Sequence, residues 1–381
     1  MINIFKIQQN ILFICPSTNS GTRERMLLRD SLLLKEVGHN VFVYCIKDSY
    51  LDQECVRLGI NVIYHVGKRP MNVFKWHKLN TLRSFFKRVD VNIVHCYELN
   101  FLWPVAFFLR KKKLTPLFFT LTNEVTKFYH QFWYRPLLTR LDLIFIPVRE
   151  MIDSVTTHMD IPQRKIYFSG LGLKKIKKSS EEKTMDSNVW NFSCWVNDHE
   201  ESGKELSACF DAIWAVNTSF QLKKIAHLHL YSSRKWDTNV ITEKLRSQIK
   251  KLGIEKFVHF HEDTNVQNIT SDIWISYNSN IPLEDYTLIA MLKGIPTIMP
   301  RNATTSEICR FYEGLNLTFK TSDSRDLRSA MQEITSKISR GAEAKLTARD
   351  ELWIEHGEEG YKYNLYKIYE KHLNKRKRFY S

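Results

Sequence analysis

The sequence predicts an α/β protein made of two Rossmann-like domains that face each other across a cleft. The chain has 381 residues, more than one hydrophobic core usually accommodates. Short apolar runs rich in β-branched and aromatic residues alternate with amphipathic segments of helical period, which is typical of a parallel sheet covered on both faces. This series stops at a charged stretch near residue 174 and then begins again, so two successive units are expected.

The first half contains seven apolar runs that we interpret as strands, with helices between them. The strands are expected at 10–16, 40–45, 60–66, 91–96, 116–122, 141–148 and 165–170. The clearest helix follows the first strand, at 23–38, where leucines recur at helical spacing and Gly38 provides a C-terminal cap. Further helices are expected at 76–89 and 102–113, so strands and helices alternate throughout this half.

The second half repeats the pattern after a charged stretch of low apolar content. Strands are expected at 190–196, 225–233, 257–262, 272–279 and 315–320, and helices at 204–216, 242–253 and 325–338. We therefore place an N-terminal domain at 1–173, a linker at 174–185, a C-terminal domain at 186–355, and a basic helix at 356–381 that packs back on the N-terminal domain. No GxGxxG follows the first strand and no GxxxxGK[ST] occurs, which argues against a dinucleotide site and a P-loop.

The net charge of +15 belongs to the first half of the chain. Residues 1–178 hold 28 Lys and Arg against 13 Asp and Glu, whereas residues 179–381 hold 28 against 28. The excess indicates either a solvated basic surface or a face that binds an anionic membrane or substrate. The segment "FKWHKLNTLRSFFKR" mixes basic and aromatic residues like an interfacial helix, and "RKKK" at 110–113 adds a cluster. No nucleic-acid motif is present, so no nucleic-acid partner is expected.

The start of the chain and its cysteines indicate a cytoplasmic protein. The N-terminus lacks the shape of a signal peptide, and the longest apolar stretch, "LNFLWPVAFFLR", is too short to cross a bilayer. The seven cysteines are scattered, and several lie in apolar runs. We interpret them as reduced core residues and expect neither a disulfide nor a zinc site.

Two segments have the character of ligand-binding turns. Small residues at 17–21, including Asn19, Ser20 and Gly21, follow the first strand and precede a helix, so backbone N–H groups there can approach a ligand. A plain strand-to-helix connection is the alternative. The segment 281–308 leads from acidic residues through a short apolar helix, a Lys-Gly-x-Pro break and an apolar strand to a polar loop that ends at Glu307.

These segments resemble those of bacterial GT-B glycosyltransferases of the large retaining group. The opening "ILFICPSTNSGTRERMLLRDSLLLKEVGHNVFVYC" is similar to their first strand, small-residue loop and helix with its Gly-His-x-Val step, and "VNIVHCYE" to their Asp-Ile-Val-His strand. "AMLKGIPTI" resembles their Glu-Ala-Met-x-x-Gly-x-Pro-Val signature, and Glu307 the Glu beyond it. The resemblance covers most of the chain in order. It implies metal-independent transfer of a sugar from a nucleotide-sugar, without a cofactor.

The positions that carry chemistry in that family differ in type here. Its donor-phosphate Lys falls on Ser202, its strand-end Arg near Trp195 or Val196, and the Glu before Ala-Met on Ile289. The expected donor-binding residues are therefore Gly203, Lys204, Glu284, Asp285, Tyr286, Thr287 and Glu307. On the acceptor side we expect Asn19, Ser20 and Gly21 in the loop, with Asn123, Glu124 and His95 as catalytic candidates. A core histidine is the alternative for His95, and solvated helix starts are the alternative for Lys204, Glu284 and Asp285.

Three functions remain open at this point. The first is a glycosyltransferase that acts on a glycan or lipid-linked acceptor in surface polysaccharide assembly, peripheral on the inner face of the membrane. The second is a catalytically inactive GT-B protein that serves as the partner or glycan-binding subunit of another transferase. The third is another two-domain α/β enzyme, such as a sugar epimerase.

Overall fold

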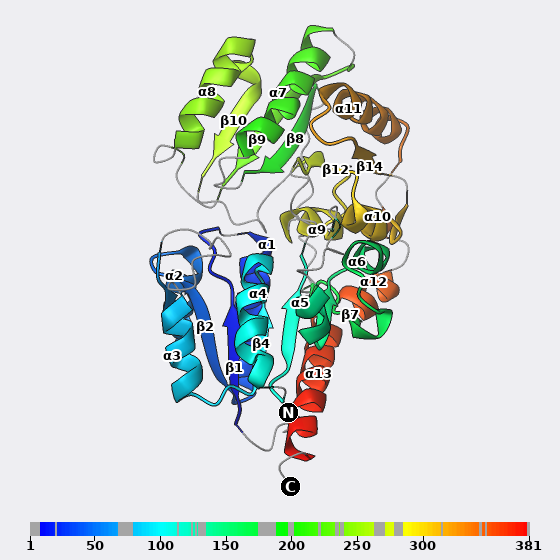
Figure 1. The fold of residues 1–381 in the computed structure, drawn as a ribbon. Coiled ribbons are helices and arrows are strands. Elements are labelled where there is room, and N and C mark those ends of the chain that lie inside the picture. Colours follow the sequence, from blue (N-terminus) through cyan, green and yellow to red (C-terminus); the bar gives the residue numbers. More distant parts are fainter. Residues whose placement is uncertain are drawn as a thin grey trace. The chain divides into compact units, whose positions relative to one another are not determined.

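The computed structural model consists of two α/β units, each built on a parallel sheet (Figure 1). It describes residues 8–19, 21–67, 79–112, 114–122, 125, 128, 135–173, 188–196, 202–219, 222–232, 236, 240–262, 271–277, 285–313, 315–342, 345–346 and 349–378. One unit comprises Met1–Lys174 with Trp353–Ser381, and the other comprises Lys175–Leu352. The expected domain limits at 173 and 355 lie close to these divisions, and the expected linker 174–185 lies outside the described residues.

The first unit has a sheet of seven parallel strands in the order β3-β2-β1-β4-β5-β6-β7. The strands are β1 Asn10–Ile14, β2 Asn40–Ile46, β3 Asn61–His65, β4 Ile93–Cys96, β5 Leu117–Thr120, β6 Leu143–Ile146 and β7 Ile166–Phe168. All seven predicted strands are therefore present. Side chains of β1 point alternately to two buried faces, because both faces are covered by helices.

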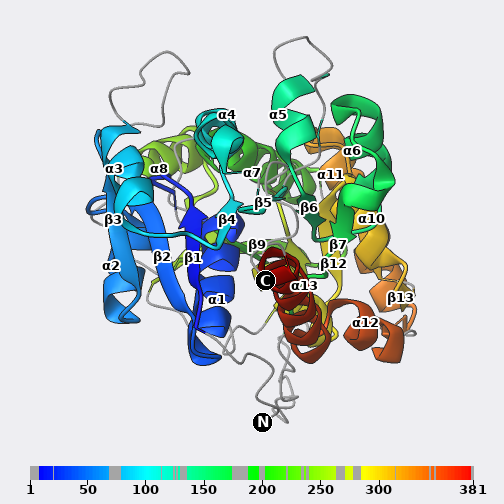
Figure 2. The ribbon, with the colours of Figure 1, turned by 60° about the horizontal axis from the view of Figure 1, so that its bottom comes forward.

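Helices cover both faces of this sheet. They are α1 Thr22–Glu36, α2 Tyr50–Arg57, α3 Asn80–Arg88, α4 Leu99–Phe108, α5 Arg135–Arg140, α6 Met151–Met159 and α13 Glu358–Arg378, with the short 3-10 helices η2 Leu109–Lys111 and η3 Gln163–Lys165. As predicted, Gly38 ends the first helix, with a left-handed φ of 93°. The α1, α2 and α13 helices share one apolar cluster with β1 and β2, and Figure 2 shows α13 beside α1.

The C-terminal helix is an integral part of the first unit. Its residues Tyr361, Leu365, Ile368, Tyr369 and Leu373 are buried in the same cluster as the first two strands. These positions recur every three or four residues, so one stripe of the helix faces the sheet. The basic residues of the tail thus share a helix with an apolar stripe that holds it on the N-terminal unit.

In the described part of the segment expected to be interfacial, the α3 helix packs both of its phenylalanines inward. Phe86 is buried, and the half-buried Phe85 packs edge-on against Phe42 of β2 with ring centroids 5.0 Å apart. The basic residues Arg83 and Lys87 are exposed. Residues 68–78, which include the rest of the segment, lie outside the described residues. In its described part, α3 is an ordinary surface helix with a basic outer side.

The second unit has six parallel strands in the order β10-β9-β8-β11-β12-β14. They are β8 Val189–Trp195, β9 Ile225–Tyr231, β10 Val258–His261, β11 Ile273–Ile275, β12 Thr297–Pro300 and β14 Asn316–Phe319. The helices are α7 Ser202–Thr218, α8 Val240–Leu252, α9 Asp285–Leu292, α10 Ala303–Cys309 and α11 Ser324–Ser339, with a short 3-10 helix η5 Glu255–Phe257. The division between the two units falls within α12 Arg349–His356. A two-residue antiparallel pair, β13 Tyr312–Glu313 and β15 Lys345–Leu346, completes the fold.

Candidate functional site

Each sheet has one point where the strand order reverses, and ligands of open α/β sheets bind beyond the carboxyl ends of the strands at such points. In the first unit the reversal lies between β1 and β4, which are hydrogen-bonded neighbours. In the second unit it lies between β8 and β11. The residues that follow these four strands are therefore the first place to look for a site.

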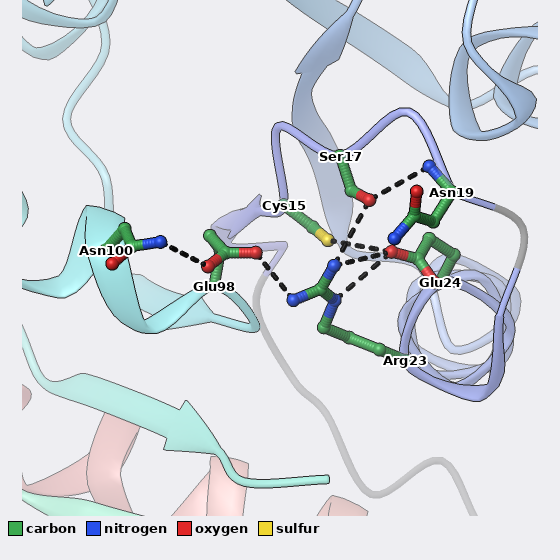
Figure 3. Close-up of polar contacts among 7 residues, drawn as sticks. All are labelled: Cys15, Ser17, Asn19, Arg23, Glu24, Glu98 and Asn100. Atoms are coloured by element: carbon green, nitrogen blue, oxygen red, sulfur yellow. Dashed lines mark hydrogen bonds and ion pairs between the residues drawn. The ribbon is translucent and has the colours of Figure 1, made fainter. Parts of the chain in front are cut away.

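A polar network lies at the reversal point of the first unit and centres on Arg23 (Figure 3). The Arg23 guanidinium donates to Glu98 Oε2 at 2.5 Å, to Glu24 Oε1 at 3.0 and 3.1 Å, and to Ser17 Oγ at 3.1 Å. Ser17 follows β1, Arg23 and Glu24 lie in the first turn of α1, and Glu98 follows β4. One guanidinium therefore joins the ends of both central strands to the start of a helix.

The outer end of the network is formed by two residues at the start of α4. Asn100 donates through its side-chain amide to Glu98 Oε1 at 3.2 Å, so both carboxylate oxygens of Glu98 are hydrogen-bonded. The side chains of Arg23 and Glu98 are 24% and 11% exposed, whereas that of Glu24 is 2% exposed. Arg23 and Glu98 are thus the charged members that a ligand can reach from solvent.

Electrostatics keep the network charged. Burial by itself raises the pKa of the Glu24 carboxyl, but the adjacent Arg23 guanidinium and the local hydrogen bonds lower it, and the net pKa lies below the ordinary value. Cys15 Sγ lies 3.9 Å from Glu24 Oε1, and burial raises the pKa of this thiol well above its ordinary value. The thiol stays protonated, and two carboxylates share one guanidinium. The carboxylate of Glu98, the more exposed of the two, suits the hydroxyl groups of a sugar or alcohol.

The predicted acceptor-side loop adjoins this network. The backbone N–H of Asn19 donates to Ser17 Oγ at 3.0 Å, which folds the loop back on β1. Gly21 precedes α1, and a Cβ at this position would lie 3.3 Å from Glu24 Oε2. The small residue here therefore leaves room for a carboxylate of the protein itself. Ser20 lies outside the described residues.

His95 lies in the core of the first unit, as the alternative interpretation held. Its side chain has no exposed surface, and both ring nitrogens are hydrogen-bonded, to Tyr369 Oη at 2.6 Å and to Thr120 Oγ1 at 2.7 Å. Burial lowers its pKa to about 3, so the ring is neutral at neutral pH. We therefore no longer place His95 among residues that contact substrate. Asn123 and Glu124 lie outside the described residues.

The reversal point of the second unit is occupied by aromatic side chains. Trp195, the last residue of β8, stacks on Tyr286 of α9 with ring centroids 3.9 Å apart and an interplanar angle of 20°. Trp195 is 3% exposed and shares an apolar cluster with Tyr231 and Trp274. The strand end where the resemblance places an arginine is thus filled by a packed aromatic pair.

Two of the predicted donor-binding residues of α9 and α10 have side chains that point inward. Thr287 is fully buried, and its hydroxyl accepts a hydrogen bond from Trp274 Nε1 at 3.1 Å. Glu307 is also fully buried and lies in the α10 helix, not in a loop, with an ion pair to Arg310 at 3.5 Å. The helix forms earlier than expected because Asn302 and Thr305 cap it reciprocally. Thr287 is thus a packing residue of α9, which corrects its expected role.

The remaining donor-binding residues fall at helix starts. Gly203 and Lys204 lie in the first turn of α7, which follows β8, and Asp285 begins α9, which follows β11. The first N–H groups of such helices lack partners within the helix and can receive a phosphate. The side chains of Lys204 and Asp285, and the whole of Glu284, lie outside the described residues.

Sequence reasoning missed the residues that form the network. Arg23 and Glu24 read as ordinary polar positions of an amphipathic helix, and Glu98 as the second residue after a strand. The available signal was topological: both β1 and β4 end beside the point where the strand order reverses, so the polar residues that follow them were candidates. Trp195 carried a similar signal, because an aromatic residue there replaces the expected cation.

No protein-family model matches this sequence, and no curated protein resembles it in sequence. Solved structures resemble it over nearly its whole length. A glycosyltransferase from Rickettsia africae has a TM-score of 0.67 at 15% identity, over 96% of this chain and 99% of that one. HepE of Anabaena in complex with UDP and glucose has a TM-score of 0.67 at 13% identity, over 95% and 99%. Sucrose-phosphate synthase of Thermosynechococcus elongatus has a TM-score of 0.66 at 11% identity, over 96% and 99%.

These comparisons show the fold. The chain has the GT-B fold of these glycosyltransferases, with two α/β units of the predicted kind. Among the described residues, every helix is too short or too polar to cross a membrane.

Proposed function

We propose that this protein is a glycosyltransferase that moves a sugar from a nucleotide-sugar to a glycan or lipid-linked acceptor in surface polysaccharide assembly. The observation that carries the proposal is the fold that both units share with glycosyltransferases. One of these glycosyltransferases, HepE, was solved in complex with UDP and glucose. The polar network at the β1/β4 reversal point supports it, because carboxylates and amides there can bind acceptor hydroxyl groups.

The proposed mechanism assigns each unit a part. Acceptor hydroxyl groups bind at Glu98 and Asn100, where Arg23 fixes the carboxylate in place. The donor diphosphate binds at the starts of α7 and α9, where N–H groups and Lys204 stabilise the negative charge of the leaving nucleotide. The reaction uses no metal or other cofactor in this proposal, since helix ends and side chains supply the positive charge.

A panel of nucleotide-sugars, scored for nucleotide release with and without extracts of lipid-linked or glycan acceptors, tests this function. A transferase releases nucleotide faster when the acceptor is present, and excess EDTA leaves the rate unchanged. Thermal shift with the same panel reports binding separately, since a ligand of the native state raises the unfolding temperature. Binding of no nucleotide and release from no donor would overturn the proposal.

A second candidate function follows from the aromatic pair at the second reversal point. Trp195 and Tyr286 occupy the strand end where the family resemblance places a cation for the donor phosphate. A chain of this fold without donor chemistry would act as the partner or glycan-binding subunit of another transferase. The same panel separates the two functions: the binding subunit binds glycan acceptor without any stabilisation by nucleotides.

We also propose that the first unit rests on an anionic membrane surface on the cytoplasmic side. The ends of α3 and η2 lie together, since Lys112 Nζ donates to the Phe86 carbonyl at 3.1 Å. Phe107 nearby in α4 is 49% exposed. The exposed basic residues of these two elements are Arg83, Lys87, Arg88 and Arg110. Each basic group near such a surface contributes about 1 kcal/mol, screened by salt.

Co-sedimentation with vesicles tests the membrane proposal. A variant with Arg83→Gln, Lys87→Gln and Arg88→Gln should bind anionic vesicles at least tenfold more weakly than the parent at low salt. The matched control removes three exposed charges of the second unit on α8, with Lys244→Gln, Lys250→Gln and Lys251→Gln. Equal loss in both variants, or equal binding of the parent to neutral vesicles, would show that this surface is merely solvated.

A further inference from the structure

Four histidines form an array on one face of the second sheet, apart from both reversal points. His227 and His229 belong to β9, and His259 and His261 belong to β10, the edge strand (Figure 1). All four are half-buried. They alternate along their strands with core residues, among which Leu228 is fully buried, so the four imidazoles share the face opposite the main core.

The ring nitrogens of the array meet in pairs across the two strands. His229 Nδ1 lies 2.9 Å from His261 Nε2, and His227 Nδ1 lies 2.8 Å from His259 Nε2. The ring centroids of these pairs are 5.2 and 4.9 Å apart. His261 also stacks on Tyr231 at 4.5 Å, which holds its ring against the sheet. Each pair is therefore joined by a hydrogen bond between two imidazole nitrogens.

The orientation of His229 is fixed by an amide and a carboxylate. Asn191 Nδ2 donates to Asp272 Oδ2 at 3.1 Å, so Asn191 Oδ1 faces His229 Nε2, at 3.0 Å. A carbonyl oxygen only accepts, and His229 Nε2 therefore carries a proton. In the neutral ring the lone pair then lies on Nδ1, the atom directed at His261. A hydrogen-bonded partner on the far nitrogen is the usual support of a metal-binding histidine.

We propose that the His229–His261 pair, with His227 and His259 beside it, binds one divalent transition-metal ion such as Ni²⁺, Cu²⁺ or Zn²⁺. Two imidazole nitrogens at bond lengths of about 2.0–2.1 Å are separated by roughly 2.8–3.0 Å when they occupy adjacent positions of a square or octahedral ion, and by about 3.3 Å around a tetrahedral one. The observed 2.9 Å is the length of a hydrogen bond between these nitrogens and equals the separation in the first arrangement, so an ion can replace the shared proton once His261 carries its proton on Nδ1. Water completes the coordination, because the face is half open to solvent.

The chemistry of the array selects the ion. Neutral imidazole prefers zinc, copper and nickel over magnesium and calcium, which take oxygen ligands. The array lies on β9 and β10, whereas the strand order reverses between β8 and β11, so it uses none of the residues assigned to the proposed transfer reaction.

Isothermal titration of the untagged full-length chain with NiCl₂ tests the proposal, with ZnCl₂ and CuCl₂ in parallel and MgCl₂ as the negative ion. We expect about one equivalent of Ni²⁺ to bind and the unfolding temperature to rise with metal concentration, because the ion binds the folded state. The Cu²⁺ form should show nitrogen hyperfine splitting in its electron paramagnetic resonance spectrum.

Single substitutions locate the ion. His261→Gln removes one ligand of the pair and should weaken binding by at least tenfold, on the order of the loss seen when a metal ligand's own hydrogen-bonded support is removed. The matched control is His158→Gln in α6, a half-buried histidine of the first unit, which should bind like the parent. Unfolding temperatures in EDTA confirm that each variant is folded. Equal affinity of His261→Gln and the parent, or stabilisation of the parent by Mg²⁺ alone, would overturn the proposal.

Discussion

The attachment of the C-terminal helix gives the sharpest test of the fold. Tyr361 Oη of α13 donates to Asp30 Oδ1 of α1 at 2.6 Å, and Tyr97 donates to the other oxygen of the same carboxyl. The Arg29 guanidinium lies 3.8 Å from the centre of the Tyr361 ring and 3.5 Å from Asp30 Oδ1. Tyr361 is 4% and Asp30 is 1% exposed, so water cannot easily replace a lost partner.

Replacing Tyr361 with Phe should therefore loosen α13. A hydrogen bond to a buried charged group contributes about 1.5–3 kcal/mol. Amide exchange in the peptides of α13 should then accelerate roughly 10- to 150-fold, as measured by hydrogen-exchange mass spectrometry, because 1.36 kcal/mol is a factor of ten. Tyr363→Phe is the matched control on the same helix, since Tyr363 is 59% exposed. Unchanged exchange in Tyr361→Phe, or equal changes in both variants, would refute this account.

Three further predictions concern the site and the core. Glu98→Gln should lower kcat/KM by 10- to 150-fold in a transfer assay, because Arg23 loses its charged partner and acceptor hydroxyls lose a carboxylate. Glu54 on α2 is also a carboxylate paired with an arginine, and Glu54→Gln should leave kcat/KM unchanged. Lys204→Ala should lower turnover on the order of 10²-fold if this cation stabilises the leaving nucleotide, and full activity would place the donor elsewhere. Burial lowers the pKa of His95 from 6.5 to about 3, so the neutral ring stabilises the folded state above pH 6.5 and this stabilisation is lost as the pH falls toward 3. When the pH falls from 7 to 5, the parent's free energy of unfolding should therefore decrease by about 2 kcal/mol more than that of His95→Gln. Urea unfolding of both proteins at the two pH values measures this difference.

The sequence predicted the fold well because its signals are local. Each strand of the first sheet is a short apolar run, and Gly38 marks the end of α1 by its left-handed backbone. The charged stretch after residue 173 and the apolar stripe of the tail from Tyr361 likewise required no knowledge of distant contacts. Periodicity and turn chemistry are properties of neighbouring residues, so they survive in a single sequence.

The site was harder to predict because its contacts are long-range. Arg23 and Glu98 are 75 positions apart and meet only because β1 and β4 are neighbours in the sheet. His95 looked like a catalytic candidate, yet its partner Tyr369 lies 274 positions away and makes it a core residue. For Thr287 the decisive fact is the indole of Trp274 beneath it. Polar residues reveal their roles only when the fold supplies their partners.

The aromatic pair at the second reversal point bears directly on how a donor would be held. Trp195 and Tyr286 fill the strand end with an uncharged stack, so a diphosphate there finds no side-chain cation from β8. The backbone N–H groups at the start of α7 are independent of side-chain identity, and they can still receive a phosphate. A transferase of this design depends on helix ends and on Lys204, whereas a binding subunit needs neither. Nucleotide affinity, measured in the parent and in Lys204→Ala, is therefore the quantity that separates the two proposed functions.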